Sequence, residues 1–327
     1  MSQRMLILGG ARFHGLQAAE FFSNAGYEVY VLNRGNYKTS YGSHIKHMRA
    51  DRNDADALKS VLKDKYFDVV IDNNAYNNSH INIILNLIRD RCGHYIFTSS
   101  VAVYLMASSD RRLKEDDATG ILKEPYSPAV REYAINKLAA ENALIENARG
   151  MNCTILRFPN IYGEGDFTAK LSHFYYRFRD GGRILLEEEV DRFSLIYVKD
   201  VVRALECVIR NEACRGRIIN IADPVDYNYD EFFIAVYGDK YNRDKLLLVP
   251  AEKIWNGGYC FSFTWSPSLD TSLSQCLFGD LSYTPISVWS KDTLEWELEN
   301  FKYRNLSPDY IRLREVELKL IEEYCGD

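Results

Sequence analysis

The fold is decided near the amino terminus, by the stretch Met5-Leu-Ile-Leu-Gly-Gly-Ala-Arg-Phe-His-Gly15. Its apolar first part is typical of a buried strand, and the glycines that follow predict a tight turn into a helix over residues 15–24. Such a turn lets backbone N–H groups and a helix N-terminus face the pyrophosphate of a dinucleotide. Arg12 stands where the usual dinucleotide fingerprint has a glycine, so a purely structural turn is the alternative.

Outward from this stretch, short apolar runs alternate with amphipathic segments over the first 160 residues. Further strands are predicted at 28–32, 67–71, 95–98 and 153–156, with helices at 54–63, 81–89 and 132–147. Apolar, β-branched strands separated by helices indicate a parallel sheet that is covered on both faces. The expected fold class is α/β, a doubly wound parallel-sheet Rossmann fold with a smaller, mainly C-terminal substrate-binding lobe.

The character of the sequence changes after residue 162. Residues 227–277 are rich in aromatic side chains and show no regular period. We expect an NAD(P)-binding Rossmann domain at 1–162 plus about 194–225, a substrate-binding lobe at about 163–193 plus 226–300, and a C-terminal helix within 301–327. The chain is expected to return from the lobe and complete the sheet near Tyr197 and Asn220.

Composition excludes several classes of protein. The 327 residues are 46% hydrophobic and 26% charged, typical of a globular chain, and the net charge of -6 argues against a nucleic-acid-binding role. The seven cysteines form no C-x-x-C pair and the histidines lack ligand spacing, so no metal is expected. No apolar run approaches the roughly 18 residues of a membrane span. A strand is predicted to begin by Met5, so no signal peptide is expected. A cytoplasmic protein with no membrane partner is therefore predicted.

The segment after the second strand bears on cofactor choice. An NAD site usually offers a carboxylate there to the ribose 2′-hydroxyl, whereas this chain has Asn33-Arg34-Gly35. The Arg34 guanidinium matches a 2′-phosphate in charge and shape, and Arg12 is a second candidate for the same group. NADP(H) is predicted in preference to NAD(H). NAD(H) is the alternative if Arg34 is only a solvated turn residue.

The candidate catalytic pair is Tyr133 and Lys137, which share one helical face at a spacing of four. With 23 tyrosines in the chain, about one Tyr-x-x-x-Lys is expected by chance, and Tyr241 and Lys245 form a second. Position favours Tyr133, because its helix follows a strand that ends Thr98-Ser-Ser100, at the sheet edge where open α/β sheets bind ligands. The alternative for the two serines is that their hydroxyls only satisfy backbone groups.

Together these features resemble the extended short-chain dehydrogenase/reductase superfamily, of the sugar-nucleotide epimerase/dehydratase type. The matching stretches, in the family's order, are residues 9–15, Asp51, 73–76, 99–104, 133–137, 156–163, 197–200 and 220–222. The resemblance covers most of the chain and implies an NAD(P)-dependent enzyme.

Roles for single residues follow from the resemblance. Tyr133 would be the acid/base, Lys137 would hold the nicotinamide ribose and lower the pKa of Tyr133, and Ser100 would polarise the substrate, matching better than Ser99. Substrate contacts are expected from Ser100, Asn160 and Arg192. Cofactor contacts are expected from Gly9, Gly10, Arg12, Phe13, Gly15, Asn33, Arg34, Asp51, Arg52, Asn74, Ala75, Tyr133, Lys137 and Phe158.

Departures from the family pattern narrow the reaction. Val101 and Ala102 stand where family dehydratases carry an Asp-Glu pair, so water elimination is not expected. The leading hypothesis is an epimerase-type oxidoreductase acting on a secondary alcohol or ketone of a sugar nucleotide or related sugar. An NADPH-dependent ketoreductase is the alternative within the fold, and a non-catalytic cofactor- or RNA-binding protein is the alternative outside enzymology. The C-terminal stretch 308–324 is a candidate packing or homodimer element.

Overall fold

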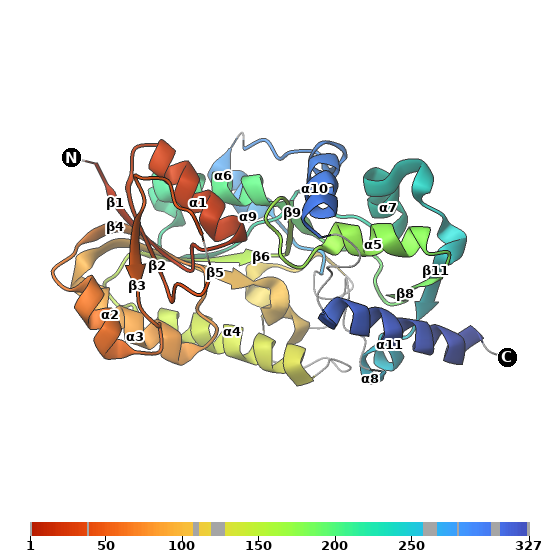
Figure 1. Ribbon diagram of the computed structural model, residues 1–327. Coiled ribbons are helices and arrows are strands. Elements are labelled where there is room, and N and C mark those ends of the chain that lie inside the picture. The colour runs from red at the N-terminus through yellow and green to blue at the C-terminus, as the bar shows by residue number, and fades with distance from the viewer. Residues whose placement is uncertain are drawn as a thin grey trace.

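A parallel sheet organises the first two thirds of the molecule. The computed structural model describes residues 2–37, 39–106, 111–118, 128–257, 267–279, 281–301 and 308–325. In that part of the chain seven strands form one sheet in the order β10-β6-β5-β4-β1-β2-β3, and every neighbouring pair is parallel (Figure 1). The strands are β1 (Arg4–Leu8), β2 (Glu28–Asn33), β3 (Lys46–Arg49), β4 (Phe67–Asp72), β5 (Cys92–Ser100), β6 (Cys153–Phe158) and β10 (Arg217–Asn220). The predicted doubly wound Rossmann fold is confirmed.

Helices cover both faces of this sheet, as Figure 1 shows. One apolar layer joins the sheet to α1 and α6, and the opposite layer joins it to α2, α3 and α4. These helices are α1 (Phe13–Asn24), α2 (Ala55–Leu62), α3 (Asn78–Ile88), α4 (Pro128–Asn147) and α6 (Val198–Arg210). Short 3₁₀ turns are η1 (Arg89–Arg91), η2 (Val101–Met106), η3 (Glu115–Asp117), η4 (Glu212–Cys214), η5 (Gly238–Lys240) and η6 (Arg243–Lys245).

The strand order reverses at β1, which lies between β2 and β4. Connections leave such a switch point in opposite directions, so a crevice opens at the carboxyl ends of these strands. The glycine turn after β1, the turn after β2 and the turn after β4 all end at this crevice. The fold thereby collects the predicted cofactor residues at one edge of the sheet.

Two small parallel sheets stand apart from the large one. Strand β7 (Asn160–Tyr162) pairs with β9 (Leu195–Tyr197), and β8 (Ile184–Glu187) pairs with β11 (Leu246–Val249). The expectation that Tyr197 helps to complete the main sheet is therefore wrong, although β10, which contains Asn220, does join it beside β6. The three-residue β9 leads directly into α6, and the register Tyr162↔Tyr197 matches it to the equally short β7.

Aromatic side chains form a second core beyond β7. It contains the fully buried Phe174, Phe232, Phe233 and Trp289. The stretch for which no regular period was found begins with a helix, α7, whose start is fixed by a capping box between Asn228 and Glu231. The remaining helices are α5 (Lys170–Arg179), α7 (Tyr229–Tyr237), α8 (Ala251–Asn256), α9 (Ser272–Phe278), α10 (Ile286–Asn300) and α11 (Pro308–Cys325).

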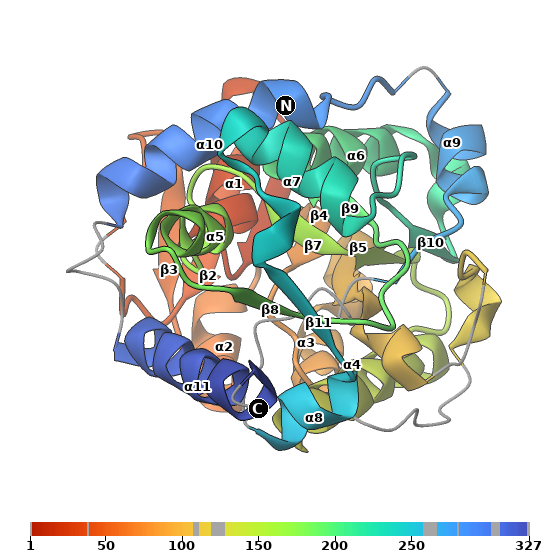
Figure 2. The same ribbon diagram turned by 90° about the vertical axis from the view of Figure 1, so that its right-hand side faces the viewer.

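The C-terminal helix α11 is tied to α5 and β8 by buried polar contacts. Glu317 accepts a hydrogen bond from the Leu185 backbone N–H (2.8 Å) and forms ion pairs with Arg177 and Arg314. Arg314 also pairs with Asp180 at the end of α5 (2.7 Å). Figure 2 shows α11 beside α8 and the β8–β11 pair. In the described ranges, none of these helices combines the length and apolar character that a membrane span requires.

Candidate active site

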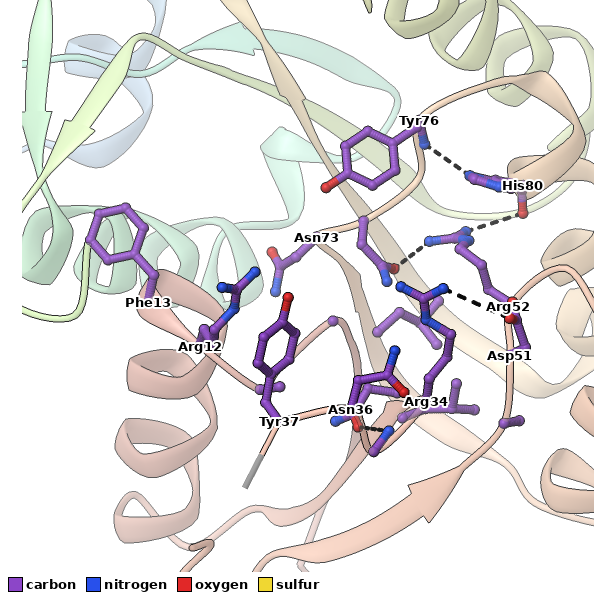
Figure 3. Close-up of a pocket in the computed structure, with 18 of the residues that line it drawn as sticks. Arg12, Phe13, Arg34, Asn36, Tyr37, Asp51, Arg52, Asn73, Tyr76 and His80 are labelled. Atoms are coloured by element: carbon purple, nitrogen blue, oxygen red, sulfur yellow. Dashed lines mark hydrogen bonds and ion pairs between the residues drawn. The ribbon is translucent and has the colours of Figure 1, made fainter. Parts of the chain in front are cut away.

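A cavity of about 430 Å³ lies at the crevice beside β1 (Figure 3). Its walls come from the glycine turn, the end of β2, the turn after β3 and the turn after β4, with Phe167 added from a distant segment. Among the expected cofactor residues, those that line it are Gly9, Arg12, Phe13, Asn33, Arg34, Asp51, Arg52 and Asn74. One cavity thus collects most of the residues that were expected to contact the cofactor.

The glycine turn fits close approach by a phosphate group. Gly9 has φ +88°, and a Cβ there would lie 3.0 Å from Asn74 Cβ. A Cβ at Gly15 would lie 2.6 Å from the carbonyl oxygen of Gly9, so a side chain at this position would disrupt the turn. Helix α1 begins at Phe13 without a side-chain cap. Its first N–H groups therefore suit an anion, which fits the phosphates of a dinucleotide.

In the turn after β2, Asn33 stabilises the turn, whereas the Arg34 guanidinium is available to bind a ligand. Asn33 accepts from the Gly35 N–H (2.8 Å) and donates to the Tyr41 hydroxyl (2.9 Å), so its amide holds the turn. Arg34 is 61% exposed, and its Nη1 lies 4.0 Å from a carboxylate oxygen of Asp51. Hydrogen bonds from Asn53 hold the pKa of Asp51 below its usual value. The Arg34 guanidinium is accordingly only loosely paired.

Arg52 builds the cavity wall instead of presenting its charge to a ligand. Both terminal nitrogens donate to Asp72 (2.9 Å each), and one of them also donates to the backbone carbonyl of His80 (3.2 Å). Asp72 further accepts from the Tyr95 hydroxyl (2.6 Å), and Arg52 also donates to Asn74. Arg52 lines the cavity, so its contact with the cofactor stays a prediction, but its charge is paired with the buried Asp72.

Tyr133 and Lys137 lie one turn apart on α4, with the lysine wholly buried. Lys137 Nζ donates to the carbonyls of Ala75 (2.9 Å) and Thr98 (3.2 Å), and it lies 6.0 Å from the centre of the Tyr133 ring. Burial lowers the pKa of Lys137 to about 8. These two bonds fasten α4 to the carboxyl ends of β4 and β5, at the same sheet edge as the cavity.

The pKa of Tyr133 is shifted upward, not downward. Burial raises the pKa of Tyr133 to about 12, and a hydrogen bond with Ser100 opposes this shift only in part. The expected lowering of the Tyr133 pKa by Lys137 is absent from this structure, in which burial dominates and the Lys137 ammonium group donates to two backbone carbonyls. In the structure the phenol is held neutral beside Ser100.

The two serines at the end of β5 differ in their partners. Ser100 forms a side-chain hydrogen bond with Tyr133, and its Oγ accepts from the Ala102 N–H (3.1 Å). Ser99 donates to Glu141 (2.5 Å), which is held in turn by the Arg157 guanidinium (2.6 Å). Ser99 therefore belongs to a buried polar network, and the hydroxyl that reaches Tyr133 is that of Ser100.

The expected substrate residues are less well assembled. Arg192, which was expected to contact the substrate, pairs with Asp226 (2.8 Å) and Glu231 (2.8 Å), so two carboxylates neutralise its charge. Asn160 is half-buried on β7. Phe158 is buried in the core at the end of β6, opposite Ser100 in the strand register.

Several cavity residues escaped the sequence analysis. They are His14, Asn73, Tyr37 and Phe167, together with His80, whose Nδ1 accepts from the Tyr76 N–H (3.1 Å). Within the described residues, His14 Nδ1 and Asn73 Nδ2 are buried without a hydrogen-bond partner, and burial lowers the pKa of His14 to about 4. His14 and Asn73 lie inside quoted motifs, so their polarity was an available signal. Phe167 had none, because it is distant in sequence.

No cluster of three or more His, Cys, Asp or Glu side chains suited to a metal occurs in the described part of the chain. The geometry instead combines a phosphate-suited turn, a cavity and a Ser–Tyr–Lys arrangement at one sheet edge. Residues 5–222, about two thirds of the chain, match the model of the NAD dependent epimerase/dehydratase family. The chain belongs to this family. The resemblance to extended short-chain dehydrogenase/reductases is thereby confirmed, and the nicotinamide dinucleotide is the family's cofactor.

The curated relatives of this chain have names that describe different functions. The chloroplast stem-loop binding protein of 41 kDa b of Arabidopsis thaliana is 27% identical over 242 residues, 70% of this chain and 61% of the relative. A UDP-N-acetyl-alpha-D-glucosaminuronate decarboxylase of Bacillus cytotoxicus is 26% identical over 179 residues, 51% of this chain and 54% of the relative. A 2′-dehydrokanamycin reductase of Streptomyces kanamyceticus is 22% identical over 256 residues, covering 76% and 70%. The chain spans about three fifths of the first relative and about half of the second.

Solved structures share the fold over more than nine tenths of this chain. An epimerase of Methanothermobacter thermautotrophicus superimposes with a TM-score of 0.73 at 18% identity, covering 92% of this chain and 94% of the other. The UDP-glucuronic acid 4-epimerase of Bacillus cereus, solved with UDP-glucuronic acid and NAD, gives 0.69 at 17% identity, covering 91% and 100%. A dTDP-glucose 4,6-dehydratase of Bacillus anthracis gives 0.72 at 15%, covering 92% and 98%. Epimerases and dehydratases alike have this architecture.

Proposed function

We propose that this chain is an NAD(P)-dependent epimerase-type oxidoreductase that interconverts a secondary alcohol and a ketone on a sugar nucleotide or related sugar. The observation that carries the proposal is the Tyr133 phenol, hydrogen-bonded to Ser100 and one turn from the buried Lys137, at the sheet edge that holds the dinucleotide-suited cavity.

The cofactor would be held along the length of the cavity. The glycine turn and the start of α1 would bind its phosphates, and Arg34 and Asp51 would lie at the adenosine end. Lys137 would bind the ribose at the nicotinamide end. When bound, the nicotinamide supplies a hydride donor or acceptor.

Proton transfer would be the task of Tyr133. Its hydroxyl would donate a proton to the substrate oxygen during reduction, or remove one from the alcohol during oxidation. Ser100 would hold that same oxygen by a second hydrogen bond and so orient it. Water elimination lacks a second acid/base pair, because Val101 and Ala102 at the start of η2 are buried aliphatic side chains.

NADP(H) would be preferred over NAD(H). Arg34, largely exposed beside the cavity, and Arg12, which also lines it, are the two cations suited to a 2′-phosphate. Asp51, near Arg34, is the residue that would instead favour the ribose hydroxyls of NAD(H).

A sugar nucleotide is the leading substrate, since solved neighbours include epimerases with such ligands. The pairing of Arg192 with Asp226 and Glu231 favours a related sugar without a diphosphate, and the relative named as a 2′-dehydrokanamycin reductase is in line with a one-way reduction. The NADPH-dependent ketoreductase therefore remains the second candidate. Cytoplasmic location and a homodimer stay predictions.

A non-catalytic role is favoured by one finding only, the relative named for stem-loop binding. The net charge of -6 opposes it, because binding to nucleic acid phosphates depends on basic surface. Binding of a stem-loop RNA that is unchanged in Tyr133→Phe, with no turnover of any sugar, would support that role.

The test is a screen in two stages. Nucleotide sugars and free aminosugars are first ranked by the melting temperature that they produce with NADP⁺ present, because a bound ligand stabilises the native state by mass action. Hits are then assayed with wild type and Tyr133→Phe. We expect the variant to lose roughly 10²–10⁴-fold in turnover, while keeping its melting temperature. Turnover without net NADPH consumption identifies an epimerase, and stoichiometric consumption identifies a reductase.

A further inference from the structure

Arg12 is held between two aromatic rings at the cofactor cavity. Its Cζ lies 3.8 Å from the ring centre of Tyr37 and 3.9 Å from that of Phe167. The guanidinium thus lies over the ring of both aromatic residues. Figure 3 shows Arg12 beside Tyr37 at the wall of the cavity, and all three residues line it.

The stack joins three segments that are far apart in sequence. Arg12 precedes α1, Tyr37 lies between β2 and β3, and Phe167 lies between β7 and α5. Thr39 Oγ1 donates to the Ala11 carbonyl (2.8 Å), which fixes the second segment to the first. Phe167 comes from beyond the large sheet. Among the described residues, its contact with the glycine turn is the non-covalent one between its ring and the Arg12 guanidinium.

The exposure of both rings indicates that the stack does not form merely to bury apolar surface. Tyr37 is 50% exposed and Phe167 is 51% exposed, so neither ring gains full burial of its apolar surface. Within the described residues, no carboxylate pairs with Arg12. A guanidinium whose faces are covered by rings keeps its N–H groups free at the edge, where a phosphate can accept from them.

We propose that Tyr37, Arg12 and Phe167 form a clasp that closes across a bound dinucleotide and slows its release. The inference rests on the cofactor site of the proposed function. The glycine turn that would hold the phosphates is the turn that carries Arg12, and the ring of Phe167, from the segment between β7 and α5, lies against Arg12 and also lines the cavity. Departure of the dinucleotide requires Phe167 to leave Arg12. Slow release is what an epimerase needs, because it must return the hydride to the same substrate.

The experiment measures dissociation, not turnover. NADPH bound to the purified full chain is displaced by excess NADP⁺ in a stopped-flow instrument, and the loss of bound-NADPH fluorescence gives the release rate. Phe167→Ala and Tyr37→Ala should each release NADPH about tenfold faster, since loss of one ring–cation contact of ordinary strength corresponds to roughly that factor. Phe167→Tyr keeps a ring and should keep slow release.

The matched control is Tyr66→Ala, which removes a ring of similar exposure (47%) that does not line the cavity. It should leave the release rate unchanged. Unchanged release in both Phe167→Ala and Tyr37→Ala, at wild-type melting temperature, would overturn the clasp while leaving the proposed function intact. A wild-type protein that binds neither NADPH nor NADH would overturn both.

Discussion

Lys137 illustrates how one residue's surroundings set the conditions for activity. Burial lowers its pKa to about 8, so the side chain loses its positive charge in mildly alkaline solution. That charge is what would hold the nicotinamide ribose of the cofactor by charge-assisted hydrogen bonds. We therefore expect kcat/KM to fall by about tenfold per pH unit above pH about 8, since this parameter reports the free enzyme.

Lys137→Arg tests whether the fall of kcat/KM above pH about 8, the alkaline limb of the pH profile, is caused by deprotonation of Lys137. The arginine stays charged at every pH at which the protein is folded, so the limb should move beyond the measurable range even if the overall rate is reduced. A limb that stays at the same pH in Lys137→Arg would assign the titration to another group.

Arg34 is the residue that we propose to favour NADP(H) over NAD(H). Arg34→Gln removes the charge but retains a polar side chain beside Asp51. Loss of one charge-assisted contact to phosphate should weaken NADPH binding by about tenfold to a hundredfold, with NADH binding almost unchanged. Fluorescence titration with both dinucleotides measures this, and equal weakening of the two would remove Arg34 from the specificity argument.

At the residue scale, motif positions were predictable and ion-pair partners were not. The glycine turn and the Tyr133–Lys137 spacing are local patterns, so the sequence shows them directly. Arg52, Ser99 and Arg192 were each assigned to a ligand because nothing in the linear sequence reveals their true partners. Those partners are Asp72, Glu141 and the pair Asp226 and Glu231, which only the folded chain brings close.

At the scale of elements, α4 carries the proposed catalytic residues and a buried ion pair on one face. Tyr133, Lys137 and Glu141 follow one another at a spacing of four, and Glu141 forms a buried ion pair with Arg157 (2.6 Å). Arg157 also donates to the Tyr104 hydroxyl (2.8 Å). The network fixes the helix to β5 and β6, and thereby positions the Tyr133 phenol against Ser100.

Breaking this pair should be costly. Glu141→Ala leaves the Arg157 charge buried and unpaired, and we expect the free energy of unfolding to fall by about 3–5 kcal/mol in urea denaturation. The control is Glu206→Ala, which breaks an exposed pair with Arg210 on α6 and should cost at most about 1 kcal/mol. Similar losses in both variants would contradict a structural role for the network.

Elements with a clean period were predicted and those without one were not. Strands β1, β2, β4, β5 and β6 contain apolar runs, which is why they could be placed from sequence, whereas β3 is largely polar and exposed. In α7 the aromatic side chains are all buried at helical spacing, but the exposed Ile234 beside them lengthens the apolar run and obscures the period. The β8–β11 pair was also missed, because parallel pairing of two four-residue strands depends on contacts distant in sequence.

At the scale of the molecule, the sheet and the aromatic core meet at the cavity. The switch point at β1 was foreseeable from the order of strands and helices, whereas the approach of Phe167 and the β7–β9 pairing were not. Dinucleotide binding should therefore stabilise the chain as a whole. NADPH at about a hundred times its dissociation constant should add about 2.7 kcal/mol and raise the melting temperature by roughly 3–5 °C in one transition. Absence of any shift would contradict a site in this cavity.

In the proposed reaction, Tyr133 transfers a proton while a hydride moves between a bound nicotinamide and a sugar carbon. The most direct measurement mixes the protein with NADPH deuterated at the transferred position and with the ketosugars selected by the melting screen, and follows deuterium in the product by mass spectrometry. Wild type should place deuterium on the new carbinol carbon. Tyr133→Phe should bind NADPH as tightly but transfer deuterium roughly 10²–10⁴-fold more slowly. Transfer at the wild-type rate in Tyr133→Phe would contradict the mechanism.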